Sequence, residues 1–419
     1  MAGEVTLQCT LARDNAEVTN VPQLAYVLME AKPTGMVANA QMPLNFSLVL
    51  DHSGSMGGEP LNNLKEAVKL VLDRMQPLDT VSIVLFEEQA RVLVPSQPVT
   101  NVAYFKSLVD GVREAGGTKM SEGMSLGLTE VQKGLVQDRV NRLLLFTDGQ
   151  TWEDESRCTT LAAQAGNMKV PIIALGLGLE WNDRLLDAIA RLSQGVADKI
   201  DTPQQMVPVF SKALQSMQST VVTNANLTLR LAAGIMPRQV WRVVPLISKL
   251  DHRVISDRDI QVYLGDLEKD QGQSVLVELT LPPRQACRFR IAQAEVVYDV
   301  PAVRLIGERV RGDVLVNFTT DTALLQQYNP QLMNIVEKVT AFRLQTQALD
   351  EAAVGNVVGA TQKLRAAATR LLEMGEMELY QTAQQALQNL QQQGQVGQVE
   401  TKKLRYETEK LTQKLTDIK

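Results

Sequence analysis

One short segment places a carboxylate and two hydroxyls at alternate positions directly after an apolar run. In "LVLDHSGSMGG", residues 48–58, these are Asp51, Ser53 and Ser55. In extended backbone, every second side chain points to the same side, so the three oxygens can face one point. Serines at the start of a helix are equally typical of capping residues. The segment alone leaves cation coordination and helix capping as alternatives.

Two further polar loops are expected to share the same edge. "EAGGTKMSEGMSLGL" presents Thr118 just ahead of a helical pattern, and "LLLFTDGQ" places Asp148 at the end of an apolar run. In open α/β sheets the carboxyl ends of the strands form the ligand-binding edge. Oxygen ligands suit Mg²⁺, which accepts hydroxyls and waters beside one or two carboxylates. Because His and Cys are missing from the set, zinc is disfavoured. The predicted cofactor is Mg²⁺, with Mn²⁺ or Ca²⁺ as alternatives.

The three segments, in this order and spacing, resemble the von Willebrand factor type A domain of bacterial cytoplasmic proteins, with its metal-ion-dependent adhesion site. The resemblance covers about residues 42–218, and the full set of site positions is present: Asp51, Ser53, Ser55, Thr118 and Asp148. It implies that the hydroxyls bind the cation directly and the aspartates partly through water. One coordination position then stays open for an Asp or Glu of a partner protein.

The elements that must position these residues follow from periodicity. Between residues 45 and 218, short β-branched runs alternate with amphipathic segments such as "PLNNLKEAVKLVLDRM". The runs are continuously apolar, which indicates that helices cover both faces of the sheet. Residues 42–218 are therefore predicted to form a doubly wound, mainly parallel α/β domain of the Rossmann-like type.

The flanks of this domain change pattern. Residues 1–41 and 219–318 alternate with period two, and neither flank alone makes a complete sandwich. We therefore expect their strands to pair, so that the α/β domain is inserted in a β-sandwich. Residues 319–419 show helical spacing with breaks near Gly355 and Gly375, which predicts a C-terminal helical bundle. The bundle is expected either to bind a partner chain or to cap its own domain.

Composition excludes several classes of function. The net charge of -5 and the pI near 5.4 provide no basic field for nucleic acid. No apolar stretch is long enough for a membrane span, and the N-terminus lacks the pattern of a secretory signal. The cysteines are Cys9, Cys158 and Cys287; without a Cys-x-x-Cys pair, they are interpreted as reduced, buried side chains. A cytoplasmic location is predicted.

Three other motifs have ordinary interpretations. His52 adjoins Asp51, but neighbouring side chains at a strand end point apart, which disfavours a Ser-His-Asp triad. The tripeptide Arg311, Gly312 and Asp313 is interpreted as a chance occurrence in a turn. The stretch "TWEDES", with Asp154, is interpreted as a solvated loop that shapes the rim of the metal site.

These observations predict a non-enzymatic, metal-dependent protein-interaction module or scaffold. The chain offers neither a nucleophile–base pair nor a complete nucleotide-binding loop. The expected partner is a protein that presents an acidic residue, and proteins resembling this one make an AAA+ ATPase a candidate. Two alternatives remain: a non-catalytic subunit of an AAA+ ATPase or chelatase-like complex, and a surface adhesin, which predicts a signal peptide, an anchor and disulfides.

Overall fold

The computed structural model describes residues 3–35, 37, 41–136, 138–151, 153–269 and 271–415. The chain forms two compact units. One comprises Ala40–Thr220 with Pro301–Arg304, and the other comprises Met1–Asn39, Val221–Val300 and Leu305–Lys419. Each unit has its own hydrophobic core.

A six-stranded sheet lies at the centre of the first unit, in the order β6-β5-β4-β7-β8-β9. The strands are β4 (Leu44–Asp51), β5 (Thr80–Phe86), β6 (Ala90–Pro98), β7 (Val140–Thr147), β8 (Ile172–Leu177) and β9 (Val196–Ile200). All neighbours pair in parallel except β6, which is antiparallel to β5. Every residue of β4 and β5 is buried, as expected for strands covered on both faces.

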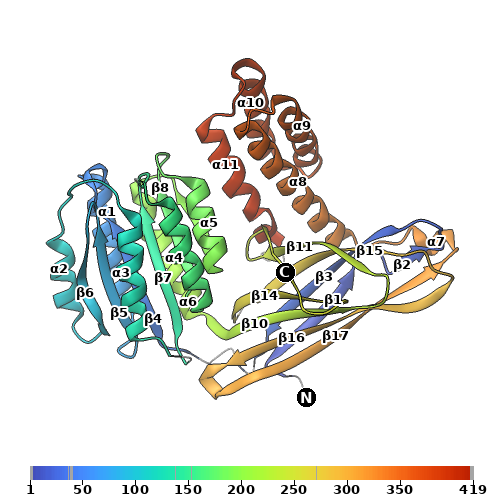
Figure 1. The fold of residues 1–419 in the computed structure, drawn as a ribbon, viewed down its shortest axis with the longest axis horizontal. Coiled ribbons are helices and arrows are strands. Elements are labelled where there is room, and N and C mark those ends of the chain that lie inside the picture. Colours follow the sequence, from blue (N-terminus) through green and yellow to red (C-terminus); the bar gives the residue numbers. More distant parts are fainter. Residues whose placement is uncertain are drawn as a thin grey trace. The chain divides into compact units, whose positions relative to one another are not determined.

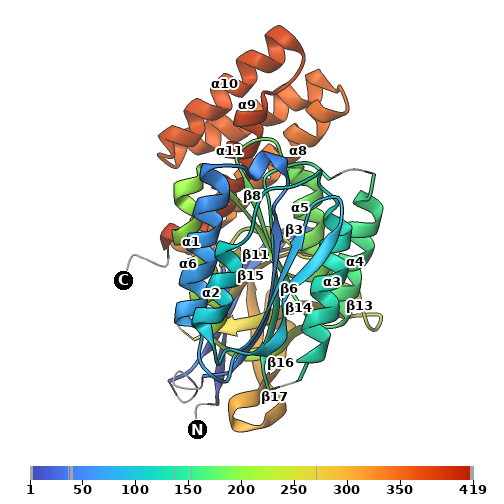
Figure 2. The same ribbon diagram turned by 90° about the vertical axis from the view of Figure 1, so that its left-hand side faces the viewer.

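Helices cover both faces of this sheet, with α1, α2 and α6 on one side and α3, α4 and α5 on the other (Figure 2). Their bounds are α1 (Glu59–Arg74), α2 (Val102–Asp110), α3 (Met120–Lys133), α4 (Glu155–Asn167), α5 (Asp183–Ser193) and α6 (Met206–Gln218), with short 3₁₀ turns at η1 (Gly54–Met56) and η2 (Pro203–Gln205). The predicted doubly wound, mainly parallel α/β fold is confirmed.

Helix α3 lies close to the sheet because glycines face the strands. A Cβ atom on Gly123 would come within 2.7 Å of the Phe86 ring, and one on Gly127 would collide with Val49 and Leu143. This helix begins two residues after Thr118, so its close packing fixes that part of the chain against the strands.

The second unit contains a sandwich of two sheets, ordered β1-β3-β15-β11-β12 and β13-β14-β10-β16-β17-β2. The strands are β1 (Val5–Leu11), β2 (Asn15–Glu17), β3 (Gln23–Pro33), β10 (Thr220–Leu231), β11 (Met236–Val244), β12 (Ser248–Lys249), β13 (Arg253–Val254), β14 (Asp259–Glu268), β15 (Gln273–Leu281), β16 (Cys287–Val300) and β17 (Leu305–Thr319). A short 3₁₀ turn, η3 (Pro301–Val303), joins the last two. β3 pairs with β15 from Gln23 opposite Leu281 to Ala31 opposite Gln273. The N-terminal strands thus complete a sandwich into which the α/β unit is inserted, as predicted.

A helical bundle packs on the sheet that contains β11 and β15 (Figure 1). Its helices are α8 (Pro330–Ala353), α9 (Val357–Glu373), α10 (Met377–Gln393) and α11 (Gln398–Glu409), preceded by α7 (Thr322–Leu325) and followed by η4 (Lys410–Leu415). Trp241 of β11 meets Phe342 of α8 edge to face, with ring centroids 6.1 Å apart. Of the two roles expected for the bundle, the structure shows the cap on its own domain.

Two expectations about this unit were wrong. Arg311, Gly312 and Asp313 lie within β17 rather than in a turn, and Gly312 pairs with Ala294 of β16. Cys287 at the start of β16 is exposed and Cys9 of β1 is only half-buried, although both were expected to be buried. In β17 the strand continues through the glycine because β16 supplies backbone partners without a register shift from Val314 to Glu308.

Within the described residues, no helix combines the length and the apolar character that crossing a bilayer requires.

Candidate metal centre

Asp51 ends β4 and is fully buried. Its Oδ1 accepts a hydrogen bond from the Ser53 backbone N–H at 2.9 Å, and its Oδ2 accepts one from the Thr147 hydroxyl at 2.6 Å. Thr147 ends the neighbouring strand β7. The carboxylate is therefore held both by its own loop and by the adjacent strand, at the carboxyl edge of the sheet.

The two serine hydroxyls of the segment lie together and reach the second aspartate. Ser53 Oγ and Ser55 Oγ are 3.2 Å apart, and Ser55 Oγ donates to Asp148 Oδ1 at 2.9 Å. Ser53 makes no side-chain capping bond to η1, and Gly58 occupies the cap of α1. The two hydroxyls are therefore not used as helix caps. They hydrogen-bond to each other and to the Asp148 carboxylate instead.

Thr118 belongs to the loop between α2 and α3, which is bound to the first loop by a backbone hydrogen bond from Gly54 N–H to the Gly116 carbonyl at 3.1 Å. Its side chain is buried, and its hydroxyl is near Gly149, since a Cβ there would be 3.8 Å from Thr118 Oγ1. The structure thus gathers all of the sequence-predicted positions at one edge of the sheet.

His52 lies inside the motif but points away from its oxygens. Its Nδ1–H donates to the Arg113 carbonyl at 3.0 Å, and its own carbonyl accepts from the Ala115 N–H at 2.9 Å. Burial lowers the pKa of the imidazole, so the ring is a neutral hydrogen-bond donor. His52 ties the Thr118 loop to the Asp51 loop and forms no triad.

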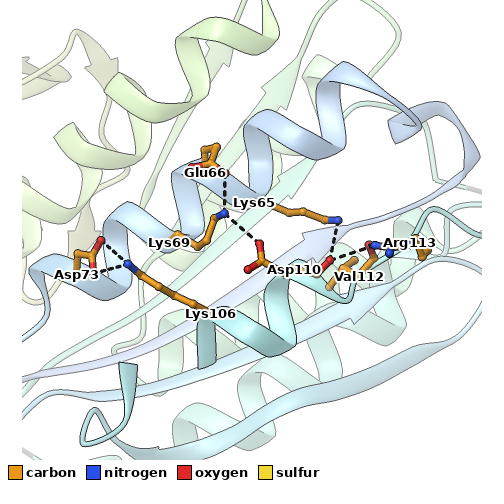
Figure 3. Close-up of polar contacts among 8 residues, drawn as sticks. All are labelled: Lys65, Glu66, Lys69, Asp73, Lys106, Asp110, Val112 and Arg113. Atoms are coloured by element: carbon orange, nitrogen blue, oxygen red, sulfur yellow. Dashed lines mark hydrogen bonds and ion pairs between the residues drawn. The ribbon is translucent and has the colours of Figure 1, made fainter. Parts of the chain in front are cut away.

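A polar network between α1 and α2 holds the start of the Thr118 loop (Figure 3). Lys65 Nζ donates to the Asp110 carbonyl at 3.1 Å, and Lys69 Nζ pairs with the Asp110 carboxylate at 3.0 Å. Arg113 also donates to the Asp110 carbonyl, at 3.1 Å. Cationic groups at the last carbonyls of a helix complement its dipole. Such exposed pairs add little stability, but they fix the point where the loop leaves α2.

The two aspartates of the site both have raised pKa values. Burial raises the pKa of Asp51, and burial together with the neighbouring Asp51 raises the pKa of Asp148 to about 6. A divalent cation favours the charged form of both carboxylates and removes this cost. The described residues contain no cluster of three or more His, Cys, Asp or Glu suited to a metal. A cation at this edge therefore depends on the hydroxyls, which is the donor chemistry of a hard ion such as Mg²⁺.

Two residues around the site were missed or misinterpreted from sequence. Asp154 is buried rather than part of a solvated loop, and its carboxylate accepts from the Ser121 N–H at 2.8 Å. Thr151 is also buried, and its hydroxyl accepts from the Met120 N–H at 3.1 Å. An Asp directly before a predicted helix is a capping signal, but the helix that it caps is distant in sequence.

Comparisons with known families and proteins agree with this geometry. Residues 45–209 match the family model of the von Willebrand factor type A domain. Residues 330–414 match a model described as the Sll0103-like, C-terminal alpha-helical domain.

Curated relatives are similar to this chain over part of their length. An uncharacterized protein of Synechocystis, sll0103, is 36% identical over 267 residues, which cover 62% of this chain and 63% of the relative. The uncharacterized protein YfbK of Escherichia coli is 24% identical over 249 residues, which cover 58% of this chain and 42% of the relative. The chain thus spans less than two thirds of each of these relatives.

Solved structures share the fold. A von Willebrand factor type A protein from Catenulispora acidiphila superposes with a TM-score of 0.79 over 96% of both chains, at 17% identity. The ArnB paralog VWA2 from Sulfolobus acidocaldarius gives a TM-score of 0.58 over 97% of this chain and 98% of its own, at 14% identity.

Proposed function

This chain is a von Willebrand factor type A domain protein, and on that premise we propose that it captures a protein partner through a divalent cation. Type A domains are in general interaction modules rather than enzymes. The proposed ligand of the cation is an Asp or Glu side chain of the partner.

The residues of the site would contribute two kinds of ligand, neutral hydroxyls and charged carboxylates. Ser53, Ser55 and Thr118 would hold the ion through neutral hydroxyls, and Asp51 and Asp148 would supply negative charge partly through water. Mg²⁺ bound by few anionic ligands remains electrophilic and accepts a further carboxylate. The Ser53 backbone N–H and the Thr147 hydroxyl hold the Asp51 carboxylate in place, so little reorganisation is needed for an ion to bind.

One observation carries the proposal: the buried Asp51 and the half-buried Asp148 lie together at a sheet edge, beside two hydroxyls that hydrogen-bond to each other and to Asp148. This arrangement is costly in itself and becomes favourable when a divalent ion binds.

We also propose the cellular compartment and the kind of complex in which the protein acts. Cys9, Cys158 and Cys287 are free thiols, which suits a reducing cytoplasm. In that compartment the protein would act as an interaction module or scaffold, with an AAA+ ATPase complex as a candidate partner. A chelatase-like complex would use it as a non-catalytic subunit.

The test compares wild type with Asp51→Ala, first for Mg²⁺ binding by isothermal titration calorimetry and then for partner capture by affinity purification. Asp73→Ala is the matched control, because it removes an exposed carboxylate of α1 that pairs with Lys106 instead. We expect Asp51→Ala to lose Mg²⁺ and every Mg²⁺-dependent partner, while Asp73→Ala keeps both. Equal Mg²⁺ affinity and equal capture by Asp51→Ala and wild type would falsify the proposal.

A further inference from the structure

Asp154 occupies the N-cap position of α4, but its carboxylate accepts a hydrogen bond from a backbone N–H of α3. It immediately precedes α4, and its side chain makes no capping bond there. Its Oδ2 instead accepts the Ser121 N–H of α3 at 2.8 Å. The side chain is only 5% exposed. A buried carboxylate at a helix start satisfies an N–H group and interacts favourably with the helix dipole.

Thr151 extends the same contact. Its hydroxyl accepts the Met120 N–H at 3.1 Å, donates to the Asp154 carboxylate, and lies 3.4 Å from the Thr118 carbonyl. Two groups from the loop after β7 thereby take up two consecutive N–H groups at the start of α3.

Helix α3 has no local substitute for these contacts. Lys119 occupies its cap position and makes no side-chain capping bond. The first N–H groups of a helix have no partner within the helix, so here the partners come from the loop that follows Asp148. The point at which α3 begins also determines where Thr118, two residues earlier, is placed.

We propose that Asp154 is a positioning residue of the metal site, a role that rests on the proposed function of that site. It holds the Thr118 loop at a fixed distance from the Asp148 loop, and it does so without contacting the ion. Thr118 and Asp148 belong to different loops, and the bonds of Asp154 and Thr151 join the Asp148 loop to the start of α3, two residues after Thr118. Outer groups that orient metal ligands typically contribute about 10–100-fold to metal affinity.

The test measures Mg²⁺ affinity of the full chain by isothermal titration calorimetry for Asp154→Ala and Asp154→Asn. Alanine removes the acceptor for Ser121 N–H, and we expect affinity to fall about 10–100-fold. Asparagine keeps an acceptor oxygen, and we expect it to restore most of the affinity. A purely structural role would lower the thermal midpoint of unfolding in EDTA without changing affinity in the folded protein.

Asn101→Ala is the matched control, because Asn101 caps α2 by accepting the Tyr104 N–H at 3.1 Å. It removes a helix cap of the same unit and should leave Mg²⁺ affinity unchanged. If Asp154→Ala binds Mg²⁺ as tightly as Asn101→Ala does, the positioning role is wrong. If Asp154→Ala does not fold, Thr151→Val replaces it, and wild-type affinity in that variant likewise overturns the role. Mg²⁺ binding by Asp51→Ala would instead overturn the metal site itself.

Discussion

Asp51 combines complete burial with an orientation fixed by hydrogen bonds and a raised pKa. Its two hydrogen bonds, from Ser53 N–H and the Thr147 hydroxyl, stabilise the carboxylate only in part, because its pKa stays above the ordinary value. Asp148 shares this condition, and Asp51 is one cause of its raised pKa. Two carboxylates held in this way make proton release and cation binding linked events.

This linkage gives a pH-dependence with a defined sign. A carboxyl group whose pKa is raised on folding stabilises the metal-free protein at low pH, and that contribution is lost as pH rises through the folded value. For Asp148 the window runs from about pH 4 to about pH 6. We expect the thermal midpoint in EDTA to fall across this window, and Mg²⁺ affinity to rise across it.

Thermal scans from pH 4 to 7.5, with EDTA or with saturating Mg²⁺, test this prediction. At pH 6 and above, saturating Mg²⁺ should restore most of the thermal midpoint that is lost between pH 4 and pH 6, because the ion favours the charged carboxylates. A midpoint that rises with pH in EDTA, or a Mg²⁺ affinity independent of pH, would contradict the assignment. Asp148→Asn is the control and should flatten both profiles.

At the scale of single residues, the sequence indicated the positions proposed to bind the cation, but it did not indicate the residues that hold their loops in place. The spacing of Asp51, Ser53 and Ser55 is local, so an alternating pattern reveals it. Asp154 stands among polar residues and looks solvated, because the N–H that it binds belongs to Ser121, which lies 33 positions earlier. A contact of that range leaves no periodic signal in the chain.

The packing of helix α3 against the sheet determines where part of the site lies. Gly123 and Gly127 let the helix approach β4 and β5 so closely that a single methyl group would collide with the strands. Since α3 follows Thr118, a shift of the helix would move that hydroxyl away from the other oxygens. The small residues therefore serve the geometry of the site as well as the core.

Gly127→Ala is expected to destabilise the protein despite the better helix propensity of alanine. Overpacking against Val49 and Leu143 costs about 1–3 kcal/mol, which outweighs the roughly 1 kcal/mol gained by replacing a helical glycine. Urea unfolding, monitored by circular dichroism, measures the difference. Thr129→Ala, at an exposed position of the same helix, is the control and should change stability by less than about 0.5 kcal/mol. An unchanged or higher stability of Gly127→Ala would show that the helix can move away from the sheet.

Strands with a regular apolar pattern could be predicted from the sequence. A strand interrupted by a residue typical of turns could not. The runs that became β4, β7 and β8 are continuously apolar and were recognised as buried strands. In β17, Gly312 suggested a turn, although it lies in the strand interior close to Cys9 of β1. Glycine in a strand often marks such a close approach of another chain segment, and the approaching residue is about 300 positions away.

At the scale of the molecule, the sandwich depends on strands from both ends of the insertion. β3 lies between β1 and β15 in its sheet, and Val27 and Met29 belong to the sandwich core. The core of the α/β unit contains none of these residues. The two units are thus predicted to respond differently to loss of the N-terminal strands.

A chain that begins at residue 41 tests this division. It lacks β1, β2 and β3, which exposes one edge of β15 and removes part of the sandwich core. We expect calorimetry to show loss of the sandwich transition, while Mg²⁺ binding by the α/β unit persists. Loss of Mg²⁺ binding in this shortened chain would mean that the α/β unit does not fold without its host.

The insertion also imposes an order on synthesis. β3 ends at Pro33, but its partner β15 begins only at Gln273, so the ribosome must add about 240 residues before the two can pair. At about 5–20 residues per second, this takes roughly 10 to 50 s. The strands and helices of the α/β sheet, the last of which ends at Gln218, are all made before then, while the edge of β3 that pairs with β15 stays open to other chains. The delay makes this edge of β3 a site at which the nascent chain is exposed to aggregation.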